Sequence, residues 1–281
     1  MRKESAGRAP GVRFSGMTLL NYLVLFVVGF ITFYPFWYVL MYSLSTYRDV
    51  LSTRFLVWPV GFTLENYRYV FRDAAMYSGA MNSVFVACMG TALSLVVTLL
   101  MAYPMAKKIE GISFISFLVY FTLLFGGGMI PTYLVVKQTG LINSLWSLII
   151  PQLVNPFYLF IMRNAIKEIP DSLGESAAID GASRGRMMWN ITLPAIRSTI
   201  IIMLILRMGR ILDAGFEQIL VMSNALVNDK VEIIDTYVYK VGLQQARYSF
   251  STAVNLFKSA IGLVMVLTVN TIAHRWEENM L

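Results

Sequence analysis

Long apolar stretches alternate with shorter polar segments along the chain. About 20 helical residues cross the hydrocarbon core of a bilayer, and six stretches are long enough, or nearly so, to do this. They cover residues 19–42, 83–106, 112–136, 145–162, 196–222 and 253–275. The third stretch is interrupted by small or ring-constrained residues, which allows either a hinge or close packing against a neighbouring helix: Gly126, Gly127, Gly128 and Pro131.

This pattern predicts an all-α, polytopic membrane protein with six transmembrane helices. The transmembrane domain is expected over residues 19–275, with a polar segment over 1–18 and a short tail over 276–281. The first apolar stretch is too long for a signal peptide and lacks a cleavage site of small residues, so we expect it to remain as an anchor.

Composition agrees with a membrane protein. Hydrophobic residues make up 57% of the chain and charged residues 14%, and mean hydropathy is +0.63, which lies outside the profile of soluble domains. The net charge of +7 would suit a nucleic-acid-binding protein. However, the Lys and Arg residues mostly flank apolar stretches, where the positive-inside rule already accounts for them. We therefore expect no nucleic-acid partner.

The distribution of Lys and Arg predicts the orientation. With the N-terminus in the cytoplasm, twelve of these residues lie in segments that face the cytoplasm and eight in segments that face outward. Because short cytoplasmic loops carry the excess of positive charge, both termini are expected in the cytoplasm. The polar loop over residues 165–195 is then cytoplasmic as well.

That loop contains IPDSLGESAAIDGASRGRMMWNITLPAI, residues 169–196, which carries five charged side chains between two apolar stretches. Ser172 and Glu175 have the spacing of a capping box, and Gly181 is suited to end a helix. The pattern therefore predicts a short helix over 172–180.

A second short helix is predicted over 184–192, and Pro194 is expected to end the unit before the fifth apolar stretch. The first helix has only small side chains on part of its surface, at Ala177, Ala178 and Gly181. The backbone of another protein can therefore approach it closely. The same residues also fit an amphipathic loop that lies on the membrane surface. From these features alone both interpretations stay open.

The spacing of this loop resembles a known motif. An acidic residue is followed by two small residues, and after three further positions comes a glycine. Nine further residues separate this glycine from an I-x-L-P sequence. The residues concerned are Glu175, Ser176, Ala177, Gly181, Ile191, Leu193 and Pro194. This is similar to the EAA motif, E-A-A-x3-G-x9-I-x-L-P, of the permease subunits of binding-protein-dependent ABC importers. Ser176 replaces the usual alanine, which is a change between small residues.

Further stretches resemble the carbohydrate branch of this family, and in particular maltose-permease G-type subunits. Three stretches carry this resemblance: AAIDGAS at 177–183, GLINSLWSLIIP at 140–151 and FYLFIMRNAIKEIP at 157–170. Two more stretches resemble those of the subgroup that imports complex oligosaccharides, including acidic ones from alginate or pectin: DTYVYKVGL at 235–243 and YSFSTAVNLFKS at 248–259. The resemblance leaves open whether the saccharide is acidic or neutral.

The resemblance implies a type I ABC importer permease fold and a coupling helix that sits in a groove of a cytoplasmic ATPase. It implies polar contacts to the ATPase from Glu175 and Asp180, close packing at Ala177 and an angle between the two short helices set by Gly181. It also implies a homologous second permease, an ATPase dimer, an extracytoplasmic solute-binding protein and an oligosaccharide substrate. The bacterial cytoplasmic membrane would be the location.

The chain itself has no sequence for nucleotide binding or catalysis. It lacks a G-x-x-x-x-G-K-[ST] stretch, so ATP and Mg²⁺ are expected on a separate ATPase chain. With one histidine and one cysteine it offers no metal-binding cluster and no nucleophile with a partner base. We therefore expect a transport subunit and not an enzyme, with no cofactor or metal of its own.

The fifth apolar stretch carries charge on one side. At the period of an α-helix its charged residues fall within an arc of about 120°: Arg207, Arg210, Asp213 and Glu217. This stripe either lines the translocation path, where arginines donate to hydroxyl or carboxylate groups of a sugar, or holds helices together, since intramembrane charges commonly pair. In an ion-coupled secondary carrier or channel, which is the alternative function, the same stripe would bind the coupling ion.

Aromatic and basic residues near the sixth stretch leave a similar choice. Tyr237 and Tyr239 are suited to stack on sugar rings, but tyrosine is also enriched at membrane interfaces. Lys258 is expected to be paired or to extend toward the interface, with contact to substrate as the alternative.

Overall fold

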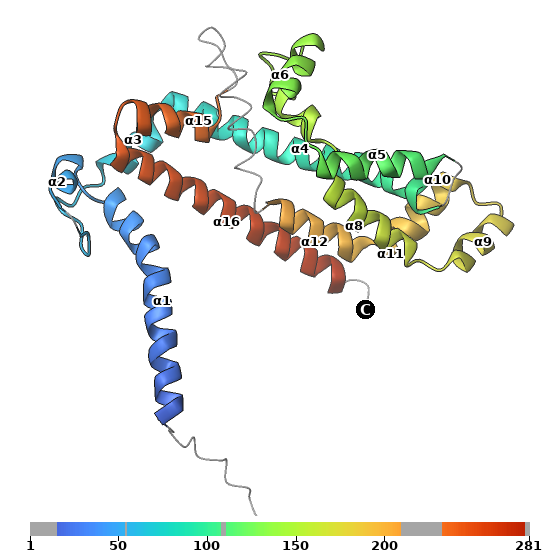
Figure 1. The fold of residues 1–281 in the computed structure, drawn as a ribbon, viewed down its shortest axis with the longest axis horizontal. Helices are drawn as coiled ribbons and strands as arrows, with labels where there is room; N and C mark the ends of the chain where they lie inside the picture. Colours follow the sequence, from blue (N-terminus) through green and yellow to red (C-terminus); the bar gives the residue numbers. More distant parts are fainter. Residues whose placement is uncertain (1–15, 54, 108–110, 209–231, 279–281) are drawn as a thin grey trace, which may run out of the picture. The chain divides into compact units, whose positions relative to one another are not determined.

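The computed structural model describes residues 16–53, 55–107, 111–208 and 232–278. These fold into helices joined by loops (Figure 1). In chain order the elements are α1 (Gly16–Ser43), α2 (Tyr47–Leu51), α3 (Glu65–Arg72), α4 (Ala74–Ala106), α5 (Ile112–Leu124), α6 (Met129–Gln138), α7 (Trp146–Ile149), the 3-10 helix η1 (Ile150–Gln152), α8 (Pro156–Lys167), α9 (Asp171–Ile179), α10 (Arg184–Met187), the π-helix η2 (Met188–Thr192), α11 (Leu193–Ala195), α12 (Arg197–Met208), α15 (Ile234–Val238), the π-helix η3 (Tyr239–Gln244) and α16 (Tyr248–Glu278). The predicted all-α class is confirmed, since the described ranges contain no strand.

Among the described residues, three single helices are long and apolar enough to cross a bilayer: α1, α4 and α16. They correspond to the first, second and sixth predicted stretches. Helix α4 begins at Ala74, well before the predicted start at residue 83. Asp73 explains this early start, because its carboxylate accepts a hydrogen bond from the Ala75 N–H at 2.9 Å and so caps the helix.

The third and fourth predicted stretches are each divided into shorter helices. Helix α5 ends at Leu124 and α6 begins after Gly128, whose φ of +80° favours glycine. The interruption predicted for the third stretch is thereby confirmed. An uninterrupted fourth helix is wrong, because Asn155 caps a new helix, α8, with Pro156 at its first position.

The fifth predicted stretch begins at a sharp bend. The helical run over 184–195 and helix α12 meet at Ile196 with an angle of 69° between them. Ile196 is buried, with 2% of its surface exposed. Helix α12 is described as far as Met208, and the remainder of the predicted stretch lies outside the described residues.

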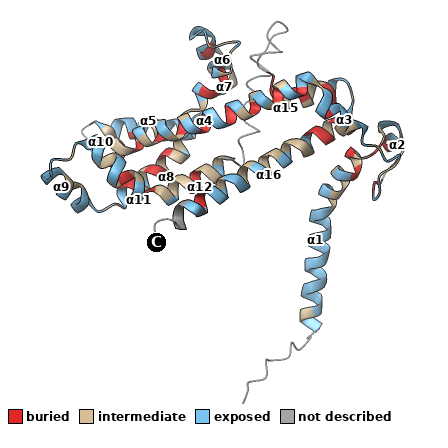
Figure 2. Ribbon diagram, turned by 180° about the vertical axis from the view of Figure 1, so that it is seen from behind, coloured by how far each residue is buried: buried red, intermediate tan, exposed pale blue. Residues whose placement is uncertain are grey.

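Residues up to 64 and residues from 65 on form two compact units. In the first unit most side chains of α1 are exposed (Figure 2), as expected of a helix that faces lipid or a partner chain. The end of α1, helix α2 and the loop after α2 share a small core of Met41, Val50 and Leu56. The Trp37 Nε1–H donates to the Val57 carbonyl at 2.8 Å and holds this loop against the end of α1.

The second unit has its largest core where α4 packs on α8. Buried side chains from α4, α8 and α12 meet there and hold these helices together: Ala102, Met105, Leu159, Met162, Ile166 and Met203. Arg163 strengthens this contact, because its Nε–H donates to the Met105 carbonyl at 3.1 Å. The base of the polar loop over 165–195 is therefore set on a packed pair of helices.

A second core joins α3, α4, α15 and α16 around Met76, Ile234, Tyr237 and Val254. The turn of η3 passes very close to the first turn of α16. A Cβ placed on Gly242 would lie 2.6 Å from the Cβ of Ser251 and closer still to its hydroxyl. Glycine is therefore required at this approach.

We expect Gly242→Ala to destabilise the second unit by about 1–3 kcal/mol, because the added methyl group overpacks a buried contact. Thermal unfolding of the purified protein in detergent measures this. Adding Ser251→Gly reopens the space, so the double variant should be more stable than Gly242→Ala alone after correction for Ser251→Gly. If the double variant is no more stable, the close approach is not the cause.

Candidate functional site

The polar loop over 165–195 forms a short helix, a tight turn and a second helical run. Helix α9 begins at Asp171 with Pro170 before it, and no side chain caps its first turn. The capping box expected from Ser172 and Glu175 is therefore wrong. Ser172 lies one residue inside the helix, where its hydroxyl is not in the N-cap position, while Asp171 places a negative charge in the first turn.

The C-terminal end of α9 is closed by a Schellman motif. The Ala182 N–H donates to the Ala177 carbonyl at 2.9 Å, and the Gly181 N–H donates to the Ala178 carbonyl at 3.1 Å. Gly181 has a φ of +77°, and no atom lies within 4 Å of where its Cβ would be. The glycine is thus required by backbone conformation and not by space.

The second helical run is longer than predicted. Ser183 caps it by accepting a hydrogen bond from the Arg186 N–H at 3.4 Å. The run continues through η2 and α11 to Ala195, one residue beyond the expected end at Pro194. The motif residue Leu193 is half-buried and Pro194 is exposed just before the bend at Ile196.

One ion pair ties α9 to the end of α4. Lys107 Nζ lies 2.9 Å from a carboxylate oxygen of Asp171, and both side chains reach solvent. Beside this pair is a cavity of about 330 Å³ whose walls include Gly174 and Ala178 of α9 and Ile191 of η2. Two of the small residues of α9 therefore face this cavity, which is formed within the same chain.

The outer face of α9 is unoccupied by the described residues. At 100° per residue Glu175, Ser176 and Ile179 share one side of the helix, and all three are exposed. Glu175 lies at the edge of this side, because it also lines the cavity beside the Lys107–Asp171 pair. Ile179 exposes 85% of its surface. Sequence reasoning missed Ile179, although an isoleucine four residues after Glu175 on a short polar helix could have been recognised as an apolar docking residue.

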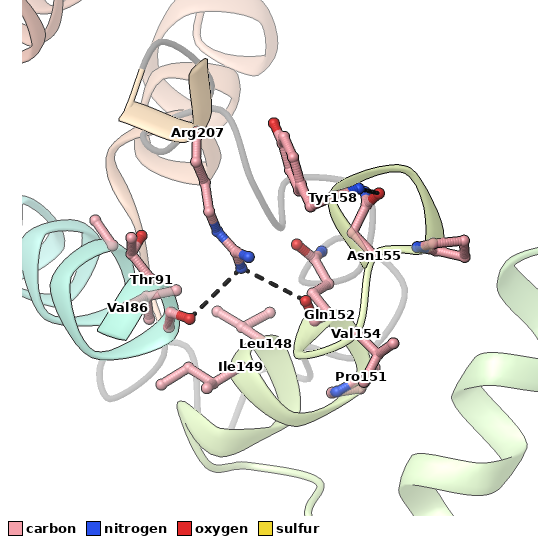
Figure 3. Close-up of a pocket in the computed structure, with 13 residues that line it drawn as sticks. Val86, Thr91, Leu148, Ile149, Pro151, Gln152, Val154, Asn155, Tyr158 and Arg207 are labelled. Atoms are coloured by element: carbon pink, nitrogen blue, oxygen red, sulfur yellow. Dashed lines mark hydrogen bonds between the residues drawn. The ribbon is translucent and has the colours of Figure 1, made fainter. Parts of the chain in front are cut away.

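Arg207 lies in the wall of a cavity of about 570 Å³ between α4, η1, the start of α8 and α12. Figure 3 shows its guanidinium pointing into the cavity, with hydrogen bonds toward α4 and toward Gln152. It donates to the carbonyls of Gly90 and Gln152, each at 3.5 Å, and to the hydroxyl of Ser94. Ser94 in turn donates to the Leu153 carbonyl at 2.6 Å.

The other predicted path residues lie elsewhere or outside the description. Arg210, Asp213 and Glu217 are outside the described residues, so the stripe is seen only at Arg207. Lys258 is paired, with its Nζ 2.6 Å from a carboxylate oxygen of Asp235. Neither side of this pair lines the Arg207 cavity.

The two tyrosines near the sixth stretch are not on that cavity either. Tyr237 is buried, and its hydroxyl donates to the second carboxylate oxygen of Asp73, the residue that caps α4. Burial and the neighbouring Asp73 raise the pKa of Tyr237 above its ordinary value. Tyr239 is half-buried at the start of η3. A buried tyrosine cannot stack on a sugar in this conformation.

A second ion pair stabilises the region around α15 and η3. Lys240 Nζ lies 2.7 Å from a carboxylate oxygen of Glu232, and the Asn82 side-chain amide donates to the Glu232 carbonyl at 2.9 Å. The segment before α15 is thereby held to the first third of α4. In this conformation Lys240 and Glu232 stabilise the fold.

Comparison with known proteins shows one consistent likeness. The family model described as "Binding-protein-dependent transport system inner membrane component" matches residues 16–279. Protein LplC of Bacillus subtilis (strain 168) is 42% identical over 195 residues, which are 69% of this chain and 64% of that protein. The polygalacturonan/rhamnogalacturonan transport system permease protein YtcP of the same organism is 42% identical over 183 residues, which are 65% of this chain and 63% of YtcP.

These alignments span just under two thirds of the two relatives. A solved structure is also similar, that of a bacterial ABC transporter involved in the import of the acidic polysaccharide alginate. It has a TM-score of 0.74 and 22% sequence identity, over 98% of this chain and 99% of its own. At this identity the likeness shows the fold.

Proposed function

We infer that this chain, which belongs to the family of binding-protein-dependent transport system inner membrane components, is a permease subunit of an ATP-driven ABC importer. Family membership and the long apolar helices make it a multi-pass inner membrane protein. The proposed cargo is an oligosaccharide, which an extracytoplasmic binding protein would deliver. Both termini are proposed to lie in the cytoplasm, as the Lys and Arg distribution indicates.

One observation carries this proposal: a short helix is held on the transmembrane core while its outer face stays open. The Lys107–Asp171 pair and the packed base at α8 hold α9 in place. Its outer face presents Glu175, Ser176 and Ile179. An exposed apolar side chain beside a charge suits a groove in another protein.

The geometry suits transmission of force. The Schellman turn at Gly181 joins α9 tightly to the run over 184–195, and this run meets α12 at 69°. A displacement of α9 by a closing ATPase dimer would therefore act on α12 through short, hydrogen-bonded segments. We propose that this rocks the helices from inward-facing to outward-facing.

The partners and cofactors follow from this mechanism. A homologous second permease would complete the path, and the ATPase dimer would bind ATP and Mg²⁺. Glu175, Ser176, Ala177, Asp180 and Gly181 are proposed for the contact with the ATPase. The names of YtcP and of the alginate importer favour an acidic oligosaccharide as cargo over a neutral one.

An ion-coupled carrier is the less supported alternative. It would need a charged relay in the fifth stretch, and within the described residues of that stretch Arg207 donates to neutral oxygens of Gly90, Ser94 and Gln152. It would also leave α9 without a role. A carrier would keep its activity when α9 is altered, and this difference can be measured.

We expect Glu175→Ala to lower oligosaccharide uptake about tenfold, because interface energy is concentrated in few residues and tenfold corresponds to about 1.4 kcal/mol. ATP hydrolysis by the assembled complex should remain, since the change lies outside the nucleotide sites. Uptake into proteoliposomes and phosphate release measure the two activities. Glu168→Ala is the matched control, because Glu168 is also exposed but precedes α9. Equal uptake in both variants would count against an ATPase contact at α9.

A further inference from the structure

The guanidinium of Arg207 has hydrogen-bonding capacity that the described residues use only in part. An arginine offers five N–H donors. Two of the acceptors of Arg207 are carbonyls at 3.5 Å, which is at the long limit of a hydrogen bond. Among the described residues no carboxylate pairs with it. Partly buried charges normally have an opposite charge beside them, and the described part of this site leaves room for an anionic partner at the guanidinium.

The walls around Arg207 add positive potential. The described residues that line the cavity include one cation and no carboxylate. Asn155, Pro156 and Tyr158 line it as well, which places the N-terminus of the 12-residue helix α8 at the cavity. That end of a helix carries partial positive charge.

The cavity wall also contains a polar atom without a partner. Thr91 lies on the same side of the cavity as Gly90, is 7% exposed, and its Oγ1 has no hydrogen-bond partner. A buried hydroxyl without a hydrogen-bond partner is unfavourable unless another molecule supplies that partner. Together with Arg207 it provides a second donor for an oxygen-rich ligand.

The size and position of the cavity suit part of a saccharide. Its volume of about 570 Å³ lies within the range of about 300–1,000 Å³ that ligand sites occupy. Tyr158 supplies an aromatic wall next to the cation, as Figure 3 shows. A guanidinium is not expected to face lipid, so this side of the unit should face the interior of the assembled transporter.

We propose that Arg207 and the adjoining cavity wall bind the carboxylate of a uronate unit in the passing oligosaccharide. This rests on the proposed import function and deepens it. The planar fork of the guanidinium matches the two oxygens of a carboxylate. Neutral sugars lack that group, so Arg207 selects acidic over neutral cargo.

The test uses the full transporter, co-purified with its partner chains, in proteoliposomes. The probes are trigalacturonate and its fully methyl-esterified form, which differ in charge at equal length. Arg207→Gln should lower uptake of trigalacturonate about 10- to 100-fold, from the range for hydrogen bonds to charged groups. Uptake of the ester should change less than about twofold, and Arg207→Lys should recover part of the acidic uptake because it restores the charge without the fork.

One control and one further test variant separate recognition from stability. Lys137→Gln removes an exposed positive charge far along the chain from α12 and should leave the ratio of acidic to neutral uptake unchanged. Thr91→Val is the further test variant: it keeps the side-chain shape, removes the proposed hydroxyl donor and should lower acidic uptake by a few-fold. If Arg207→Gln reduces both probes equally, Arg207 merely holds α4, η1 and α12 together, and the proposal is overturned.

A binding measurement does not depend on turnover. Saturation-transfer NMR on the complex in nanodiscs should show contact with the uronate ring protons of trigalacturonate in the original chain and not in Arg207→Gln. Absence of contact in the original chain would overturn the carboxylate site. ATP-driven uptake of the neutral ester in that case would still uphold the import function.

Discussion

Gly181→Ala should lower ATP-driven uptake about 5- to 30-fold, because a residue with a Cβ costs about 1–2 kcal/mol in the left-handed conformation. The φ of +77° at Gly181 places this cost on the turn that joins α9 to the run over 184–195. The Schellman bonds from Gly181 and Ala182 would then be populated less. A loosened turn would let α9 move without displacing α12.

Gly174→Ala is the matched control for this substitution. Gly174 lies inside α9, and like Gly181 it has no atom within 4 Å of a Cβ position. Its backbone is helical, so alanine should stabilise α9 by about 0.5–1 kcal/mol and leave uptake intact. Uptake and phosphate release are measured for both variants at equal expression. If Gly181→Ala transports as well as Gly174→Ala, the rigid turn plays no part in coupling.

Lys258→Met should destabilise the protein by about 3–5 kcal/mol, because it leaves the carboxylate of Asp235 without its partner in a largely enclosed site. The exposed fractions of the two side chains are 13% and 17%. For a chain of this size about 2–4 °C in melting temperature corresponds to 1 kcal/mol. The apparent melting temperature in detergent should therefore fall by at least about 6 °C.

The Lys107–Asp171 pair provides the comparison. Its side chains are 33% and 81% exposed, so Lys107→Met should cost less than about 1 kcal/mol. The double variant Lys258→Met with Asp235→Leu removes both charges and should recover much of the loss. Equal melting temperatures for Lys258→Met and Lys107→Met would show that burial does not govern these pairs.

Local features of the fold could be predicted from the sequence where short-range chemistry decides them. Helix α9 was placed to within one residue, because Pro170 and Gly181 punctuate it on both sides. The break in the third stretch followed from three consecutive glycines. The first turn of α9 was assigned wrongly because Ser172 and Asp171 are both suited to a helix start, and Pro170 decided which residue came first.

Long-range contacts could not be predicted in the same way. The stripe in the fifth stretch identified Arg207 as unusual, but its acceptors on α4 and η1 depend on how three helices pack. The same holds for the bond from Tyr237 to Asp73, which are far apart in the chain. Periodicity shows that residues share a face and does not identify what lies opposite.

Cross-linking at Ile179 tests whether α9 docks on an ATPase. Ile179→Cys in a Cys88→Ser background, labelled with a benzophenone maleimide, is irradiated in native membranes, and the products are identified by mass spectrometry. We expect a product with a polypeptide that carries a phosphate-binding loop, and none from Lys137→Cys treated in the same way. Products with lipid or with this chain alone at position 179 would contradict it.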